Sequence, residues 1–180
     1  TIDTFSIAFW RMIIASAALL IVVLVFRRLF NADLIKRNIK DLFLLSLLLG
    51  IHFIFFISAV KDTTVLNATV LVNTAPLFSV FISSFAFKIR PSAPATVGLT
   101  LSFIGVCVIG LAEATTSSAN PATFSPALKG DLEAILAAVA IAVYLTYGMK
   151  VRSRLGIFSI MLPTYALAAV FIGLISLPAG

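Results

Sequence analysis

The chain has 180 residues, of which 61% are hydrophobic and only 11% are charged, and its formal net charge is +6. A water-soluble domain needs charge on most of its exposed faces, so this composition excludes one. The basic excess is therefore interpreted as a signature of membrane topology, and nucleic-acid binding is not expected.

Six apolar stretches fill almost the whole chain. Each is close to the ~20 residues that a helix needs to cross ~30 Å of hydrocarbon. None shows the period-two alternation of a β-barrel strand, and helices satisfy their own backbone hydrogen bonds in lipid. The sequence predicts an all-α integral membrane protein with six transmembrane helices, at residues 5–26, 42–60, 64–87, 94–112, 132–149 and 156–178.

The basic residues between these spans predict the orientation. Ten Lys and Arg residues lie in the loops after the first, third and fifth spans, whereas the other loops hold only Lys61 and Lys129. Under the positive-inside rule the ten lie in the cytoplasm and the chain starts outside. We expect a multi-pass protein of a cell membrane, either a bacterial inner membrane or a plasma membrane. Residues 27–40 mix apolar with basic side chains, which suits a short helix on the cytoplasmic surface.

The first two spans each carry one candidate residue. Arg11 lies about two turns, roughly 10 Å, below the external surface. It could attract a carboxylate or phosphate, snorkel outward, or pair with Glu133 of the fifth span. His52, the only histidine, could bind a substrate or titrate near neutral pH, or it could be a neutral ring bonded to a neighbouring helix. No second His, Asp or Glu lies one turn away, so a metal site is not expected.

The third span is the richest in polar residues. Pro76 removes one backbone hydrogen bond and frees a carbonyl near Val72, so the sequence predicts a bend there. Two interpretations remain open: a substrate-facing, kinked helix, or amides and hydroxyls that only hold helices together. Spacings of three, four and seven place four residues along one face, namely Asn67, Val70, Asn73 and Thr74.

In the fifth span, Tyr144 and Tyr147 share a face toward the cytoplasmic half. They are candidates for an aromatic cavity wall, with simple packing as the alternative. Catalysis in the membrane would need a Ser–His pair, an aspartyl pair or a His-rich motif, and none appears, so no catalytic residue, metal or cofactor is assigned. A channel and a non-transporting membrane assembly subunit remain alternatives, although no carbonyl filter sequence appears.

Internal symmetry links the first and sixth spans. Residues 5–7 and 158–160 both read Phe-Ser-Ile, and the same offset of 153 aligns Ala15 with Ala168. The first span enters from outside and the sixth from the cytoplasm, so the two equivalent helices would run in opposite directions, as in an inverted repeat. Such a repeat needs an odd number of spans per unit, and five fits the offset.

Residues 59–78 resemble the junction of the third and fourth helices in the EamA family of drug/metabolite transporters. There, a short external turn leads into a helix with small residues and then a proline, here Pro76, followed by apolar residues. Gly98 and Gly105 match the family's glycine-containing fifth helix. Residues 129–132 (Lys-Gly-Asp-Leu) resemble the opening of its second repeat, and Arg11 lies where its second helix commonly has an arginine.

This resemblance implies ten helices in two inverted five-helix repeats, of which the chain holds the second to the seventh. Residues 1–113 would form the first repeat without its first helix, 114–128 an external linker, and 129–180 the start of the second repeat. It also implies a permease or exporter that moves a small metabolite or drug-like solute by alternating access, with binding near the midplane. The expected partners are that small-molecule substrate and the lipid bilayer, and a homo-oligomer is left open.

Overall fold

The computed structural model describes residues 4–26, 32–86, 88, 92–116 and 128–176, and within these ranges every regular element is an α-helix. The prediction of an all-α protein is thereby confirmed. Most of the linker predicted at residues 114–128 lies outside the described residues. In chain order the helices are α1 (Thr4–Val25), α2 (Ala32–Arg37), α3 (Ile39–Asp62), α4 (Val65–Val72), α5 (Ala75–Ala86), α6 (Ala93–Thr116), α7 (Leu128–Arg152) and α8 (Ile157–Ser176).

The helices coincide with the six predicted spans, and the third span is divided into α4 and α5. Five stretches of the described chain are long and apolar enough to cross a membrane: Ala8–Val25, Ile39–Asp62, Val65–Ala86, Lys129–Arg152 and Ile157–Ile175. In α6 the apolar stretch Ala93–Gly105 is shorter. The short helix expected within residues 27–40 is α2. It has Asp33 in its first turn and Lys36 and Arg37 in its last turn, and this placement of charges interacts favourably with the helix dipole.

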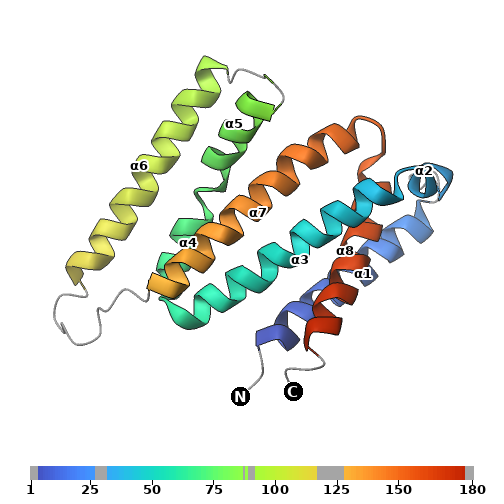
Figure 1. Cartoon of the computed structure of the whole chain (residues 1–180), viewed down its shortest axis with the longest axis horizontal. Helices are drawn as coiled ribbons and strands as arrows, with labels where there is room; N and C mark the ends of the chain where they lie inside the picture. Colours follow the sequence, from blue (N-terminus) through green and yellow to red (C-terminus); the bar gives the residue numbers. More distant parts are fainter. Residues whose placement is uncertain (1–3, 27–31, 87, 89–91, 117–127, 177–180) are drawn as a thin grey trace.

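Successive spans run in opposite directions (Figure 1). The end of α1, the start of α3, the end of α7 and the start of α8 lie at one end of the bundle, which also holds α2. The end of α3, the start of α4, the end of α6 and the start of α7 lie at the other. The described basic residues of α2, the start of α3 and the end of α7, namely Lys36, Arg37, Lys40, Lys150 and Arg152, therefore lie at one end, as the charge count predicts. We call it the basic end and the other the acidic-loop end, because Asp62, Asp131 and Glu133 lie there.

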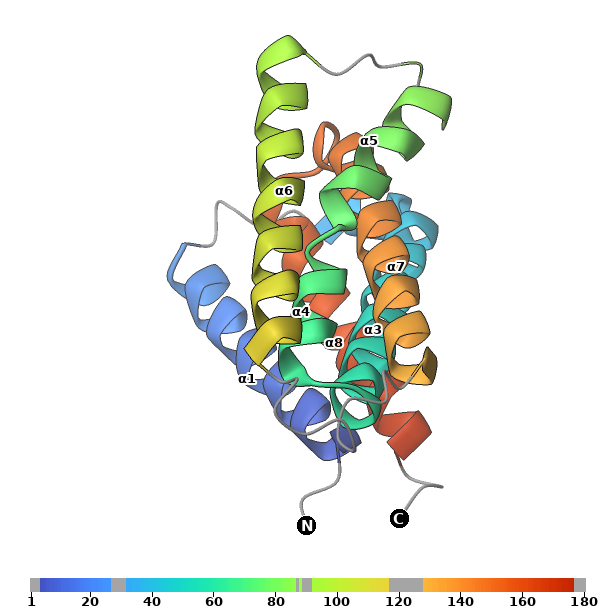
Figure 2. The same ribbon diagram turned by 90° about the vertical axis from the view of Figure 1, so that its left-hand side faces the viewer.

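The antiparallel helices α3 and α7 form the centre of the bundle. Helices α8 and α1 pack on one side of this pair, whereas α4 and α5 pack against α7 on the other. Helix α6 lies outermost, beside α4, and most of its described side chains are exposed (Figure 2). Small residues allow the close approach at the centre, since Ala134, Ala137, Ala138 and Ala142 of α7 are fully buried.

Side-chain hydrogen bonds link α3 to α7 at the basic end and at mid-height. At the basic end, the Tyr147 hydroxyl donates to Oδ1 of Asp41 over 2.7 Å. Near the middle, Nδ1 of His52 lies 2.9 Å from the carbonyl oxygen of Ala137. A carbonyl can only accept, so the bond requires the proton on Nδ1. Both bonds cross between helices that come from distant parts of the sequence.

At the acidic-loop end the same two helices meet most tightly. Lys129 Nζ donates to Asp62 over 2.5 Å, and Thr63 Oγ1 donates to Asp131 over 3.0 Å. Gly130 lies between these contacts, where a Cβ would be 2.7 Å from backbone atoms of Asp62 and of Thr63. Only glycine therefore fits at this position without moving one helix end.

The first and sixth spans, whose sequences match at an offset of 153, pack against each other as antiparallel helices α1 and α8. Ala8 and Met12 of α1 and Ala168 and Ile172 of α8 belong to one buried cluster. Helices α1 and α8 therefore run in opposite directions, as the inverted-repeat hypothesis requires. The boundaries of the two repeats stay a prediction.

Candidate functional site

The third span is broken between α4 and α5, where the sequence predicts only a bend. The N–H and the hydroxyl of Thr74 both donate to the carbonyl of Leu71, over 3.1 and 2.6 Å, which closes the last turn of α4. Pro76 then falls in the first turn of α5, where its missing N–H leaves no helical hydrogen bond unmade. The local chemistry therefore ends one helix and starts the next inside a single span.

Two polar residues of α4 take part in the helix's own hydrogen bonds. The N–H of Asn67 donates to Oγ1 of the N-cap residue Thr64, at 3.1 Å. The hydroxyl of Thr69 donates back to the carbonyl of Val65, at 2.6 Å. Asn67, predicted to lie on the substrate path, lines none of the cavities described below.

Asn73, Thr74 and Pro76, also predicted to lie on the path, face α6, and Pro76 lines a larger groove as well. Together with Leu77 they line a space of about 10 Å³, the size of one water, whose far wall is formed by Leu99, Ser102 and Phe103. The helix break is therefore covered on this side by α6.

A larger groove of about 600 Å³ continues from this space between α5, α6 and α7. Its wall is mainly apolar, and three of its residues, Ser79, Ser102 and Thr146, have a hydroxyl group. The lining residues are Pro76, Ser79, Val80, Ala95, Gly98, Leu99, Ser102, Leu145, Thr146 and Met149.

Thr146 is the most informative residue of the groove. It is 2% exposed, and within the described part of the chain its Oγ1 has no hydrogen-bond partner. Thr69 and Thr100, by contrast, donate to the carbonyl four residues earlier. Leaving a buried hydroxyl unpaired costs about 1–3 kcal/mol, so such a group commonly has a ligand or water as partner. Sequence reasoning missed Thr146, since a lone threonine in a span has no distinguishing pattern.

His52 and Arg11 lie together, away from the groove. The His52 ring stacks on Phe56 with centroids 6.1 Å apart, and the Arg11 guanidinium lies 5.4 Å from the centroid of Phe53. Neither residue lines any of the three cavities. Glu133, suggested as a partner of Arg11, forms its ion pair with Lys129 instead, at 3.8 Å.

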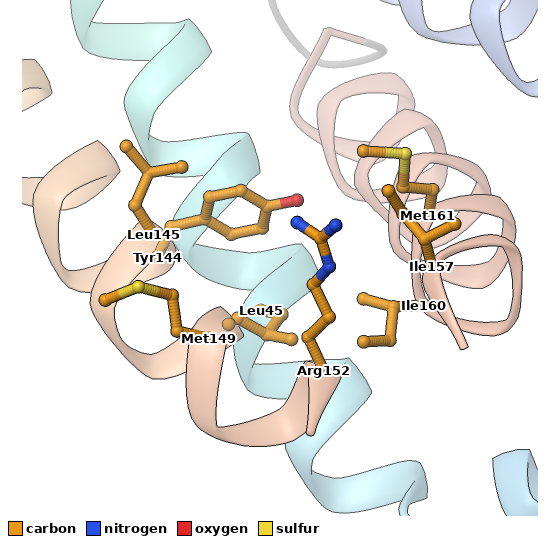
Figure 3. A pocket seen from close by; sticks show the side chains of 9 residues that line it. Leu45, Tyr144, Leu145, Met149, Arg152, Ile157, Ile160 and Met161 are labelled. Carbon is orange, nitrogen blue, oxygen red and sulfur yellow. The ribbon is translucent and has the colours of Figure 1, made fainter. Parts of the chain in front are cut away.

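The two tyrosines predicted on the substrate path, Tyr144 and Tyr147, both lie on the side of α7 that faces α3, but their surroundings differ. Tyr147 is bonded to Asp41, as described above. Tyr144 lines a separate cavity of about 140 Å³ between α3, α7 and α8, together with Gly148 and Arg152 (Figure 3). These three residues are spaced by four along α7, a signal that was available in the sequence. Tyr144 thus lines a cavity other than the groove, and its place on the substrate path stays a prediction.

The chemistry of these sites is hydrogen bonding and apolar contact. Across the described ranges, no group of three or more His, Cys, Asp or Glu residues lies close enough to hold a metal ion. The broken helix and the groove beside it can hold a solute, and neither brings a nucleophile together with a base.

Comparison with known families agrees with the fold and the sequence motifs. The family model described as the EamA-like transporter family matches residues 1–111, which is more than half of the chain. No curated protein and no solved structure matches the chain significantly.

Proposed function

This chain belongs to the EamA-like transporter family of membrane proteins, and we propose that it moves a small metabolite or drug-like solute across the membrane by alternating access, in the direction of export. The observation that carries the proposal is a transmembrane helix broken in mid-span beside a groove, one of whose wall residues, Thr146, has a buried hydroxyl with no partner among the described residues. Discontinuous helices next to cavities are a recurrent way in which transporters build binding sites.

The break supports the proposal because it separates two rigid pieces at one joint. Helix α5 packs on α7 through Ala75, Ala138 and Ala142, whereas α4 packs through Ala68 on Ala59 and Ala134. At the joint the regular pattern of bonds four residues back gives way to shorter ones, from the N–H of Thr74 to Leu71 and from the N–H of Leu77 to Thr74. A change in their relative angle can therefore alter the groove without unfolding either piece.

The lining of the groove favours a small solute that is mainly apolar and carries at least one hydrogen-bonding group. Its apolar wall gains from excluding water, and the hydroxyls of Ser79 and Ser102 can orient a polar group. The Thr146 hydroxyl is buried behind this wall and can join them only if the groove opens. Ser79 is only weakly engaged, at 3.5 Å from the carbonyl of Ala142, so its hydroxyl can turn toward a ligand.

Thr146→Val tests the groove directly, because it replaces a hydroxyl by a methyl group of similar size. The matched control is Thr164→Val in α8, whose hydroxyl is equally buried and unpartnered among the described residues but lies outside the groove. A growth-tolerance screen with the full-length protein would first identify a solute. We expect Thr146→Val to slow its efflux about 5-fold at equal membrane expression, and Thr164→Val to leave the rate unchanged.

A second pair of variants tests the break. Asn73→Leu should reduce transport, whereas Ile82→Leu, in the packed interface of α5 with α7, should be tolerated. Equal activity in both pairs would refute this location of the path. Ion leakage that does not depend on any solute would favour the channel alternative instead.

A further inference from the structure

A second cavity lies outside the groove, at the basic end of the bundle between α3, α7 and α8 (Figure 3). It has a volume of about 140 Å³. Its wall is built from aliphatic and thioether side chains of the three helices, and two polar groups enter it. Seven lining residues are apolar or glycine, namely Leu45, Leu145, Gly148, Met149, Ile157, Ile160 and Met161.

The two polar groups are the hydroxyl of Tyr144 and the guanidinium of Arg152. Both point into the space between α7 and α8 and toward each other (Figure 3). Arg152 is the last residue of α7, and its side chain turns back along the helix, as the Cα–Cβ direction in helices favours. Two donors therefore converge on one volume from positions two turns apart.

Gly148 leaves room for the side chains of Tyr144 and Arg152 to approach each other. It lies four residues from each of Tyr144 and Arg152, so it occupies the helix surface between them. A side chain there would fill the space that the phenol and the guanidinium share. A Cβ alone would meet only Leu45 Cδ2, at 3.7 Å, so the backbone has no packing need for glycine.

Arg152 is exposed, so its guanidinium faces the outside of the bundle as well as the cavity. No Asp or Glu is among the nine lining residues, and no ion pair of Arg152 occurs within the described ranges. The nearest acidic group on α3 that α7 engages is Asp41, which accepts a hydrogen bond from Tyr147. A guanidinium at the edge of a mainly apolar pocket attracts an anion, and charge-assisted hydrogen bonds to carboxylate or phosphate are strong.

We propose that this cavity binds an amphiphilic anion, with its carboxylate or phosphate between Arg152 and Tyr144 and its alkyl part against α8. The shared chemistry is an anionic head on an apolar chain. A membrane lipid and a free alkyl anion both have it, and the cavity opens at the end where lipid headgroups meet the bundle. The cavity shares the wall residues Leu145 and Met149 with the groove, but Tyr144 and Arg152 do not line the groove, and the site does not depend on the transport proposal.

The test uses the full-length protein in nanodiscs of phosphatidylcholine. Decyl phosphate is titrated by calorimetry as the free anion, and retention of phosphatidylglycerol in mixed nanodiscs is measured by native mass spectrometry as the lipid arm. Binding in either arm, if it depends on the cavity, supports the proposal, and the arm that responds identifies the source of the anion. Absence of binding in both arms overturns it.

Four variants establish dependence on the cavity. Arg152→Gln should weaken binding at least 10-fold, and Tyr144→Phe about 3-fold. Gly148→Leu keeps both donors and fills the cavity, so it should weaken binding more than 10-fold. The matched control is Arg154→Gln, which removes the same charge from a residue that is exposed like Arg152 but lies outside the cavity. Equal loss in Arg152→Gln and Arg154→Gln would show general attraction to a basic surface and would refute the site.

Discussion

Replacing Gly130 by alanine should separate the ends of α3 and α7. A Cβ at this position would lie 2.7 Å from the carbonyl carbon of Asp62 and from the N of Thr63, whereas ordinary contact begins at 3.4 Å. Both atoms are backbone, so neither can rotate away. The helix ends must move apart by about 0.7 Å, and close-packed interiors yield to such overpacking only at a cost.

The magnitude follows from the neighbouring contacts. Overpacking of this kind costs about 1–3 kcal/mol. The same displacement lengthens the Thr63–Asp131 hydrogen bond from 3.0 Å to beyond hydrogen-bonding range, which removes about another 1 kcal/mol. A total of about 2–4 kcal/mol should lower the Tm by about 4–16 °C, taking about 2–4 °C per kcal/mol for a chain of this size.

The assay is thermal unfolding of the purified protein in detergent, followed by size-exclusion chromatography. The matched control is Gly98→Ala in α6, where a Cβ meets nothing within 4 Å. We expect the control to melt at or slightly above the wild-type Tm, because alanine is favoured over glycine in a helix interior by about 0.5–1 kcal/mol. If both variants have the same Tm, the tight contact at Gly130 does not contribute to stability and the reasoning is wrong.

Two further predictions concern His52 and topology. Because the His52 ring donates to the carbonyl of Ala137, we expect His52→Gln to keep the pH profile of transport between about pH 5.5 and 7.5, and His52→Leu to cost about 1 kcal/mol of stability in the same melting assay. A profile flattened by His52→Gln would instead assign the ring to proton coupling. In a Cys107→Ala background, a cysteine at Ser117 should react with impermeant thiol reagents from outside and one at Ser153 should not; the reverse pattern would overturn the orientation.

The spans and their alternation could be predicted from sequence because they depend on hydrophobic length and on basic residues, which are local properties. The break in the third span was only partly predictable. Pro76 indicates a weakened helix, but Thr74 ends α4 through a bond to Leu71 that propensity does not reveal. The sequence therefore predicted a bend where the chain has two helices.

The cavities were less predictable because each is formed by helices that are distant in sequence. The pairing of Tyr147 with Asp41, and of His52 with the backbone of Ala137, depends on the register of α3 against α7. The periodicity of one helix defines a face and leaves open which neighbour that face meets. Thr146 became informative only once its surroundings were known to lack a partner.

The links between α3 and α7 have a consequence for biogenesis. The partners of Asp41, His52 and Thr63 lie 106, 85 and 68 residues further along the chain. During synthesis α3 therefore reaches the lipid before α7 exists, and its insertion has to be driven by its apolar residues alone. Association of the two helices is a later step, as in two-stage assembly. Damage to α7 should thus leave α3 inserted but unassembled, in a form that membrane quality control can recognise.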